Sequence, residues 1–428
     1  MSYTQSSLTA LFKEAIQPVV KKNVIAEQPF WSRIQNSSIF KNKNFSTAEN
    51  KYIIPSEIAY HANAAGRAEG SHIPVSHSGT RVRMSAYLKK VIAITDATYE
   101  VKVLQDAGGA SVEDVSTSIK NDLTRGFKDS MNIAMIGHPS SYHGDSTYSD
   151  MGVRAVVSGS GSGTGGVTLE YHKGSTVVSG AMGNHWLRAG LRLRVGTAAE
   201  ILAGSAHDNV IVSSVSSDKN SFVPTATFTW ADGDLCVPGD SDAYEDNLIT
   251  GLCKHVDNDT GTYQGLSRST YPQLQGNVAH NSGTCRAMSE AIWDQAFDLP
   301  FEYGAGSNIN FVLCNTGMRR AWKNLFTSLM QYDPTKRIVG GSQKIAISDI
   351  IPVEDPYMQY GCMYALDTSQ FEFVHGDLFA FEDLAGNIFR MVGTYGDTDK
   401  YEVRCRVFGN LICKTPRANV KIEDITEA

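Results

Sequence analysis

The sequence predicts an α+β protein that carries an inserted all-β domain. Three observations support this fold class: two long strand patterns at 51–60 and 81–95, a helical pattern of unusual length at 111–137, and short alternating segments between 151 and 262. Alternation of apolar and polar residues is typical of half-buried strands, whereas apolar residues every three or four positions are typical of helices. A chain of 428 residues has room for two or three units of about 100–200 residues each.

The N-terminal part of the sequence is predicted to make contacts outside its own domain. Residues 6–22 have apolar side chains at helical spacing, and Pro18 is expected to end or kink this helix. The helix is predicted either to join the core or to dock as an arm on a neighbouring subunit. The strands 51–60 and 81–95 flank a loop almost free of apolar residues. A two-stranded ribbon is marginally stable alone in water, so we expect it to lie against a partner.

The clearest helix in the sequence spans residues 111–137. Ser111 and Asp114 fit a capping box at its start, and Gly137 followed by Pro139 is a typical stop signal. One face carries apolar residues at intervals of three and four: Val112, Val115, Ile119, Leu123, Phe127 and Met131. At about 1.5 Å per residue the helix would be about 40 Å long, which predicts a rod along one side of the protein.

The segment 151–262 lacks helical periodicity and is predicted to be a separate β-barrel or sandwich inserted into the host domain. Short alternating runs are separated by Gly, Ser and Asp, as expected for an all-β module. These runs are VRAVVS, VTLEY, STVVS, LRLRVG, NVIVSSV, FVPTATFTW and DLCV.

Helices and strands alternate again after residue 262. The sequence predicts a helix over 282–297, a buried strand over 308–315 and a helix over 316–331 with Thr316 as its cap. The remaining predicted strands are ALDTSQFEFVH, FRMVGTY and YEVRCRVFGNLIC.

Composition and charge argue against a membrane protein and against tight, general binding of nucleic acid. The formal net charge is −7 and no long basic run occurs, whereas such binding needs clustered Lys and Arg. No apolar window is long enough to span a bilayer, and the N-terminus MSYTQSSLTALFKEA lacks the apolar core of a secretory signal. The seven cysteines are widely spaced without a Cys-x-x-Cys pair, so we expect reduced, buried thiols.

Two motifs suggest enzyme chemistry, and their context disfavours it. The stretch GSGTGG at 161–166 fits the Gly-x-Gly-x-x-Gly spacing, but a strand pattern follows it and no acidic residue stands where a ribose would need one. We predict a flexible hinge between the host and the β module there. Cys314 ends a strand just before a helix, as nucleophiles do, but no histidine lies nearby in sequence. A buried core thiol is the favoured interpretation.

No residue pattern predicts a metal site. DNDTG at 257–261 resembles the start of a calcium loop, but its Gly comes one place early and Arg268 occupies the twelfth position, where a bidentate Glu is needed. The acidic loop 232–247 is expected to be solvated, although a divalent ion there stays open. His61, His72 and His77 share the ribbon loop without a partner carboxylate or cysteine. We therefore predict no catalytic residue, no cofactor and no metal.

The order of these parts resembles the major capsid proteins of tailed bacteriophages, a fold shared with encapsulins and the herpesvirus capsid floor. YLKKVIAITDATYE followed by the helix 111–137 resembles the family's extended loop and peripheral domain, and SNINFVLCNTGMRRAWKNLFTSL resembles its axial-domain strand and helix. The most specific stretch is FEDLAGNIFRMVGTYGDTDKYEVRCRVFGNLICKTPRANVKIEDI, in which GNL, PRA and a closing strand occur in order. TGLCKHVDNDTGTYQGLSRSTYP resembles relatives that carry an inserted domain.

The resemblance implies a phage major-capsid fold in six parts. They are an N-terminal arm (1–45), an extended β-hairpin loop (46–95), a peripheral domain with a long spine helix (96–150), the inserted β-domain (151–262), an axial α/β domain (263–375), and a return through the peripheral domain to a final axial strand (376–428).

The resemblance also implies a structural role without enzyme activity. Pentamers and hexamers of the chain would form an icosahedral shell around double-stranded DNA, with the ribbon lying over one neighbour and the arm crossing another. The implied partners are a separate scaffolding protein, a portal and a decoration protein, and the implied location is the virion after assembly in the host bacterial cytoplasm. Some relatives crosslink a lysine of the extended loop to a neighbour's asparagine. No lysine occurs between Tyr52 and Leu88, so we expect no such bond from this ribbon.

Three alternatives stay open at this point. An encapsulin-like compartment would hold cargo proteins in place of DNA. A tail or baseplate protein would form rings or tubes. A cytosolic hydrolase would use Cys314 as its nucleophile.

Overall fold

The computed structural model describes sixteen segments of the chain, and the account below concerns these alone. They are residues 28–38, 45–46, 51–59, 69, 80–98, 115–137, 153–170, 186–217, 220–239, 249–282, 284–302, 308–326, 352–376, 378–382, 390–391 and 400–427. The predicted helix 6–22, the three loop histidines, the STVVS run and residues 240–247 of the acidic loop lie outside them.

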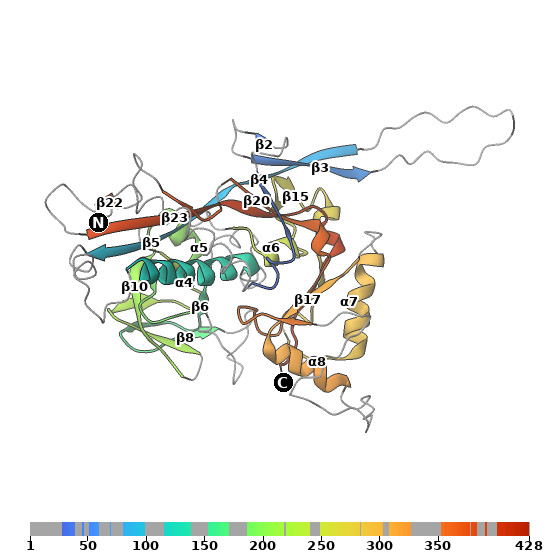
Figure 1. The fold of residues 1–428 in the computed structure, drawn as a ribbon. Helices are drawn as coiled ribbons and strands as arrows, with labels where there is room; N and C mark the ends of the chain where they lie inside the picture. Colours follow the sequence, from blue (N-terminus) through green and yellow to red (C-terminus); the bar gives the residue numbers. More distant parts are fainter. Residues whose placement is uncertain are drawn as a thin grey trace, which may run out of the picture.

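A six-stranded sheet forms the centre of the molecule, and its strands come from both ends of the sequence (Figure 1). Strand β23 crosses it and pairs with four others. The whole of β5 is antiparallel to the first ten residues of β23, with Lys89 opposite Gly409 and Thr98 opposite Lys400. The strands are β1 (Gln35–Ser38), β5 (Lys89–Thr98), β20 (Phe371–His375), β21 (Ala380–Phe381), β22 (Arg390–Met391) and β23 (Lys400–Cys413).

The long helix α4 (Val115–Ile136) lies along one face of β5 and β23. Its stripe buries Leu123, Phe127 and Met131 in one core cluster with the inward side chains of β23. The ring of Phe127 meets that of Phe379 edge-on at 5.2 Å between centroids, a favourable aromatic geometry. The helix stops at Gly137, whose φ of +74° suits glycine. The predicted helix is thus confirmed from Val115 onward.

The predicted ribbon strands pair with each other, but the second is shorter than predicted because the strand 81–95 is divided at Leu88 and its second half belongs to the central sheet. With a short third strand they form a three-stranded sheet (Figure 1). Its strands are β2 (Phe45–Ser46), β3 (Lys51–Ala59) and β4 (Thr80–Tyr87). At its base, Tyr52, Ile54 and Met84 are buried against Val374 and Ile412. The described part of the ribbon therefore packs on the body through one face.

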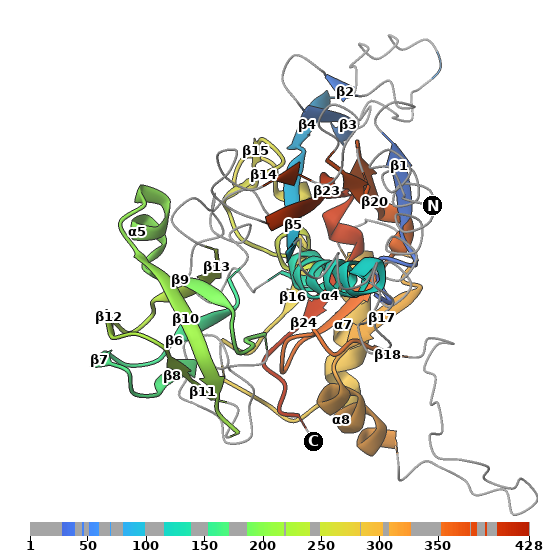
Figure 2. The same ribbon diagram turned by 60° about the vertical axis from the view of Figure 1, so that its left-hand side comes forward.

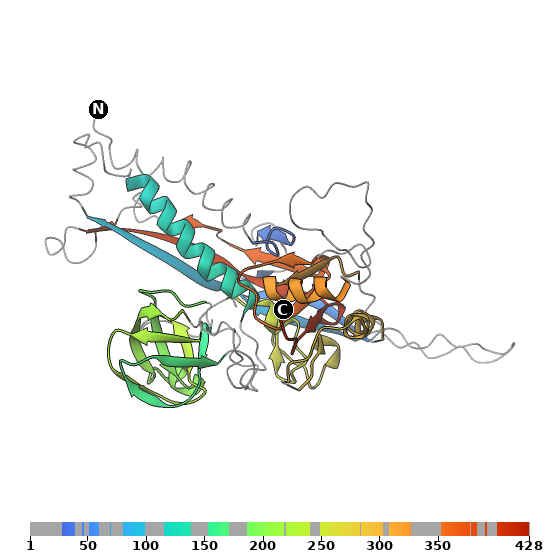
Figure 3. The same ribbon diagram turned by 90° about the horizontal axis from the view of Figure 1, so that it is seen from below.

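The inserted β module contains a closed barrel, visible in Figures 2 and 3 as a separate body beside α4. Its six strands are β6 (Ala155–Val157), β8 (Val167–Glu170), β9 (Arg192–Gly196), β10 (His207–Val215), β11 (Ser221–Pro224) and β13 (Leu235–Pro238). Helix α5 (Ala198–Ala203) covers one side and has a capping box made by Thr197 and Glu200.

The predicted end of the β module at residue 262 needs correction. The barrel's last strand ends at Pro238, and the next described residues pack with the host. Ile249 and the short helix α6 (Leu252–His255) join the core cluster of α4, and Tyr263 joins the cluster at the ribbon base. These residues pack against apolar side chains that are distant in sequence, so the local sequence pattern could not show where the module ends.

The glycine stretch 161–166 is not the predicted hinge, and this expectation was wrong. Gly161–Gly163 form strand β7, which pairs with β12 (Phe228–Trp230) inside the module. A Cβ atom on Gly161 would lie 2.7 Å from the Trp230 ring, whereas a Cβ on Gly165 would meet open space. Glycine is required at 161 because an indole packs directly on the backbone.

Replacing Gly161 with alanine is expected to destabilise the barrel by about 1–3 kcal/mol, because overpacking displaces the indole. Gly165→Ala in the same stretch should change stability by less than about 0.5 kcal/mol. Urea unfolding of the two variants checks this. Equal effects at both positions would show that the Trp230 contact does not determine the glycine requirement.

A mixed five-stranded sheet flanked by two helices forms the C-terminal α/β part. Its strands are β16 (Asn277–Ala279), β17 (Phe311–Cys314), β18 (Val353–Glu354), β19 (Met363–Leu366) and β24 (Val420–Ile422). Helices α7 (Glu290–Glu302) and α8 (Thr316–Phe326) pack together through Trp293 and Trp322, with 6.0 Å between ring centroids. In the sequence, the hairpin of β14 (Thr262–Tyr263) and β15 (Leu266–Ser267) comes between the barrel and this part.

Two local predictions in the C-terminal part were wrong. The helix predicted from 282 begins at Glu290, because Arg286 forms a parallel bridge with Ile425 near the C-terminus. Local sequence cannot reveal a pairing with a strand so far along the chain. The cap of α8 is Asn315 rather than Thr316, since Asn315 Oδ1 accepts from the Met318 N–H at 2.8 Å.

Candidate functional site

The predicted candidate residues do not come together into a reaction centre. Cys314 ends β17 as expected, but it is completely buried, and burial raises the pKa of its thiol to about 12. A protonated thiol without access to solvent is a poor nucleophile. Within the described segments, no group of three His, Cys, Asp or Glu side chains is arranged to hold a metal ion, and no helix is long and apolar enough to cross a membrane.

Arg268 occupies the position at which a calcium loop would need a glutamate. In the structure it organises the DNDTG loop. It is fully buried and forms an ion pair with Asp259. Its other N–H groups donate to the carbonyls of Leu274 at 3.0 Å and Lys254 at 2.7 Å, and it lies 4.3 Å from the ring centroid of Tyr263. The loop is therefore a turn held around a buried cationic side chain.

Arg268 also supports the base of the ribbon through its contact with Tyr263. The Tyr263 hydroxyl donates to the Cys413 carbonyl at 3.2 Å and lies 2.7 Å from His255 Nδ1. Burial, assisted by the nearby Arg268 charge, lowers the pKa of His255 to about 3, so the imidazole is neutral. Since Tyr263 packs in the same cluster as Tyr52 and Met84, this network sets how the ribbon leaves the body.

The most unusual surface is the face of β5 and β23 that points away from α4. We call it the outer face and define it by Lys90, Ile92 and Ile94 on β5 with Arg404 and Arg406 on β23. Ile92 is 42% exposed and Ile94 is 57% exposed. In Figure 1, α4 lies on the lower side of these strands and the barrel lies below α4. Neither of them covers the outer face.

Charged side chains surround the two isoleucines. Arg406 stands opposite Ile92 and Arg404 opposite Ile94 in the strand register. Glu382 lies between the cations, with carboxylate oxygens 3.8 Å from Lys90 Nζ and 3.7 Å from the nearest nitrogens of Arg404 and Arg406. All are partly exposed, so these pairs stabilise the monomer little. They hold the charges in place around an apolar stripe, as at the rim of an interface.

Sequence reasoning missed the outer face, although the sequence contained a signal. Val91, Ile92, Ala93 and Ile94 are four consecutive apolar residues in one strand. A strand with one solvated face alternates, whereas a continuous apolar run is typical of a strand buried on both faces. Among the described residues Val91 is buried, whereas Ile92 and Ile94 on the other side of the strand are exposed, so the run predicts a second cover for that side.

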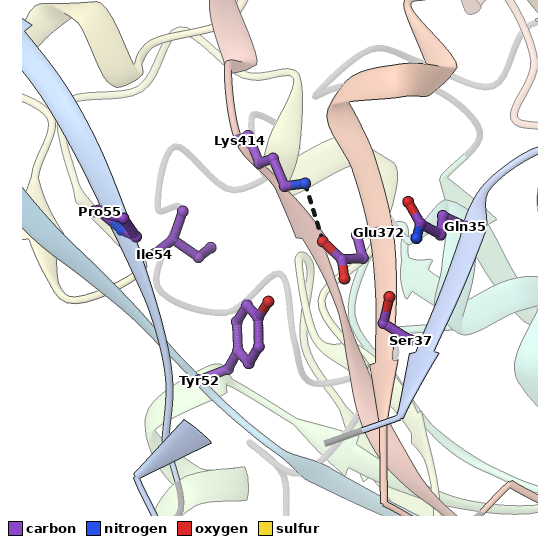
Figure 4. Close-up of a pocket in the computed structure, with 7 residues that line it drawn as sticks. All are labelled: Gln35, Ser37, Tyr52, Ile54, Pro55, Glu372 and Lys414. Carbon is purple, nitrogen blue, oxygen red and sulfur yellow. Dashed lines mark ion pairs between the residues drawn. The ribbon is translucent and has the colours of Figure 1, made fainter. Parts of the chain in front are cut away.

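A groove of about 440 Å³ opens beside the ribbon base (Figure 4). One wall is largely apolar and belongs to β3, and the other is polar and belongs to β1 and β20. On the polar wall, Lys414 Nζ lies 3.0 Å from Glu372 Oε2. Because this pair neutralises itself, the groove lacks the net charge that a small ionic substrate would need. Its lining residues are Gln35, Ser37, Tyr52, Ile54, Pro55, Glu372 and Lys414.

Comparison with solved structures shows which fold this is. A chain titled cyanophage A-1(L) capsid asymmetric unit superposes with a TM-score of 0.54 at 14% identity, covering 94% of this chain and 93% of that one. The capsid of a native GTA particle gives 0.46 at 9% identity, over 100% and 92% of the chains. An encapsulin complex from Synechococcus elongatus gives 0.40 at 8% identity, over 93% and 88%.

No protein-family model and no curated protein matches the sequence. The cyanophage superposition covers nearly the whole of both chains. The chain therefore has a phage capsid-protein fold, and the family resemblance is confirmed at the level of the fold.

Proposed function

We propose that this chain is the structural subunit of a closed protein shell, the major capsid protein of a tailed phage. Hexamers and pentamers of it would enclose double-stranded DNA, and no catalytic step is involved. The observation that carries the proposal is the outer face, part of a strand whose apolar run is typical of burial on both sides while the described residues bury only one. The fold shared with the cyanophage capsid chain supports it.

The contacts of the proposed shell follow from the shape of the chain. A neighbour's ribbon would lie across the outer face, where Ile92 and Ile94 offer apolar area and the cations around Glu382 offer a polar rim. Each such contact is modest, but every subunit gives and receives one, so the contacts add through multivalency. The net charge of −7 suits an inner wall that encloses DNA without gripping it.

The remaining assignments belong to the same proposal. Residues 1–45 would be an arm and 46–95 the extended loop; 96–150 and 376–428 would build the peripheral domain, and 263–375 the axial domain. The barrel would face outward. A separate scaffolding protein, a portal and a decoration protein would be partners, with assembly in the host cytoplasm and the virion as the final location. The absence of lysine between Tyr52 and Leu88 still predicts no crosslink from the ribbon.

Replacing Ile94 with aspartate is expected to abolish assembly while leaving the monomer folded. Ile94 is 57% exposed in the chain, so its replacement should change the free energy of unfolding by less than about 0.5–1 kcal/mol. In the shell the carboxylate would remove the apolar contact that Ile94 offers, and burying its charge at the interface is costly even with Arg404 opposite it in the strand register. Mass photometry of the expressed protein measures the loss of large particles, and circular dichroism checks the monomer.

Thr229→Asp is the matched control, because it places the same charge on an exposed strand residue of the barrel. It should assemble like the wild type, and Ile94→Val should do so as well. Normal shells from Ile94→Asp would contradict the role given to the outer face. Shells that carried cargo proteins in place of DNA would favour an encapsulin-like compartment.

A further inference from the structure

The barrel is joined to the rest of the molecule by specific buried contacts. Trp186 lies a few residues before strand β9 of the barrel. Its ring is nevertheless buried in the same cluster as Phe127 of α4. Its indole N–H donates to the Tyr357 carbonyl at 3.1 Å. A barrel side chain thus packs in the core of the host and donates a hydrogen bond there.

Two more side chains, Tyr357 and Arg154, form hydrogen bonds at this junction. The Tyr357 hydroxyl donates to Asp129 Oδ1 at 2.5 Å. Arg154, at the start of the barrel, is buried and donates to the Trp186 carbonyl at 3.4 Å. Burial lowers the pKa of Arg154 to about 10, and the nearby Asp129 opposes this shift. The guanidinium stays charged at neutral pH and is attracted to Asp129 of α4, the residue that accepts the hydrogen bond from Tyr357.

Tyr357 belongs to residues 355–361, which we call the connecting loop, and this loop also binds the C-terminal part. The Gln359 side-chain amide donates to the Gly137 carbonyl at the end of α4. The Asn315 side-chain amide donates to the Gln359 carbonyl at 3.3 Å, and the Gly361 N–H donates to Glu427 Oε1 at 3.0 Å. The seven residues of the connecting loop therefore contact Trp186 beside the barrel, helix α4, the cap of α8 and Glu427 near the C-terminus.

We propose that the connecting loop is a clamp that fixes the barrel in one orientation relative to α4 and the C-terminal α/β part. A hinge would need a flexible, solvated connection at the module boundary. The junction instead combines an inserted indole with hydrogen bonds to buried groups, and leaving such groups unpaired is unfavourable. The barrel and the α/β part accordingly move as one body, and force on the barrel reaches the C-terminal strands. This inference concerns the single chain and does not depend on its assembly.

Distance measurements between two spin labels test the clamp. One label goes on the barrel at Thr229→Cys and one on α8 at Asn324→Cys, both at exposed positions, in a Cys285→Ser background. Assembly is blocked by Ile94→Asp, so that only distances within one chain are measured. The intact clamp should give one narrow distance distribution. Adding Trp186→Ala or Tyr357→Phe should broaden or split it.

Tyr263→Phe is the matched control, because it removes another buried tyrosine hydroxyl that donates a hydrogen bond, here to the Cys413 carbonyl, but lies outside the junction. It should lower stability and leave the distribution narrow. A broad distribution with the clamp intact would overturn the proposal. So would an unchanged narrow distribution in both Trp186→Ala and Tyr357→Phe, with circular dichroism confirming that the variants are folded.

Discussion

Replacing Arg268 with methionine is expected to lower the free energy of unfolding by about 3–5 kcal/mol, the range found when one partner of a buried ion pair is removed. Arg268 is fully buried, and its loss leaves the Asp259 carboxylate with Lys254 Nζ at 3.4 Å as its remaining cation and takes the Arg268 donors from the carbonyls of Leu274 and Lys254. The Tyr263 ring also loses the cation above it. Urea unfolding of the isolated chain measures the difference.

The effect of Arg268→Met should also appear at the ribbon, because Tyr263 packs with Tyr52 and Met84 at its base. Faster hydrogen exchange in β3 and β4 than in the barrel is the expected pattern. Arg319→Met is the matched control: its pair with Glu354 is more than a third exposed on both sides, so its loss should cost less than about 1 kcal/mol. Similar losses in both variants would contradict the structural role of Arg268.

Replacing Asp355 with asparagine is expected to stabilise the chain at neutral pH by about 1–3 kcal/mol. Burial raises the pKa of Asp355 to about 6, only partly offset by the hydrogen bond from the Tyr357 N–H. Its second carboxylate oxygen has no hydrogen-bond partner within the described part of the chain. Each step of one in pKa corresponds to about 1.4 kcal/mol between the two protonation states. An asparagine keeps the acceptor for Tyr357 and carries no charge.

The sign of the pH dependence follows from linkage. The folded pKa of Asp355 is raised above that of the unfolded chain, so between about pH 4 and 6 the folded state binds more protons. The Asp355 contribution to stability is therefore present at low pH and is lost as the pH rises through 6. Asp355→Asn should flatten this part of the stability profile, measured by urea unfolding at several pH values.

Asp367→Asn is the control for Asp355. Asp367 is also buried, but its carboxylate accepts from the Ser369 N–H at 3.1 Å and the Ser369 hydroxyl at 2.6 Å. Removing that charge should destabilise the chain at neutral pH, because the two bonds to Oδ1 become neutral and weaker and the Gln370 side-chain amide loses its acceptor, Oδ2. A destabilised Asp355→Asn, or one with the same pH slope as the wild type, would contradict the assignment to Asp355.

Elements with strong periodicity could be predicted from the sequence. The stripe from Leu123 to Met131 determines one face of α4, and alternation around β3 and β23 determines their strands. Elements defined by distant partners could not be predicted. Residues before Glu290 look helical but pair with the C-terminus through Arg286. The glycines at 161–166 look like a hinge until Trp230 is seen on Gly161.

The candidate surfaces were predictable to different degrees. The run Val91–Ile94 alone indicates a strand covered on both faces, so half of the outer face could be read from the sequence. Its charged rim could not, because Lys90, Glu382 and Arg404 meet only through the pairing of distant strands. The connecting loop is equally hidden, since Trp186 and Tyr357 meet across 171 positions.

Negative-stain electron microscopy of the expressed full chain tests the central claim most directly. Closed icosahedral shells, or rings of five and six subunits, are the expected result. Particles of uniform diameter that disappear in Ile94→Asp would connect the shell to the outer face. A chain that stays a dispersed monomer at high concentration, with its fold intact by circular dichroism, would contradict the proposal that it builds a shell.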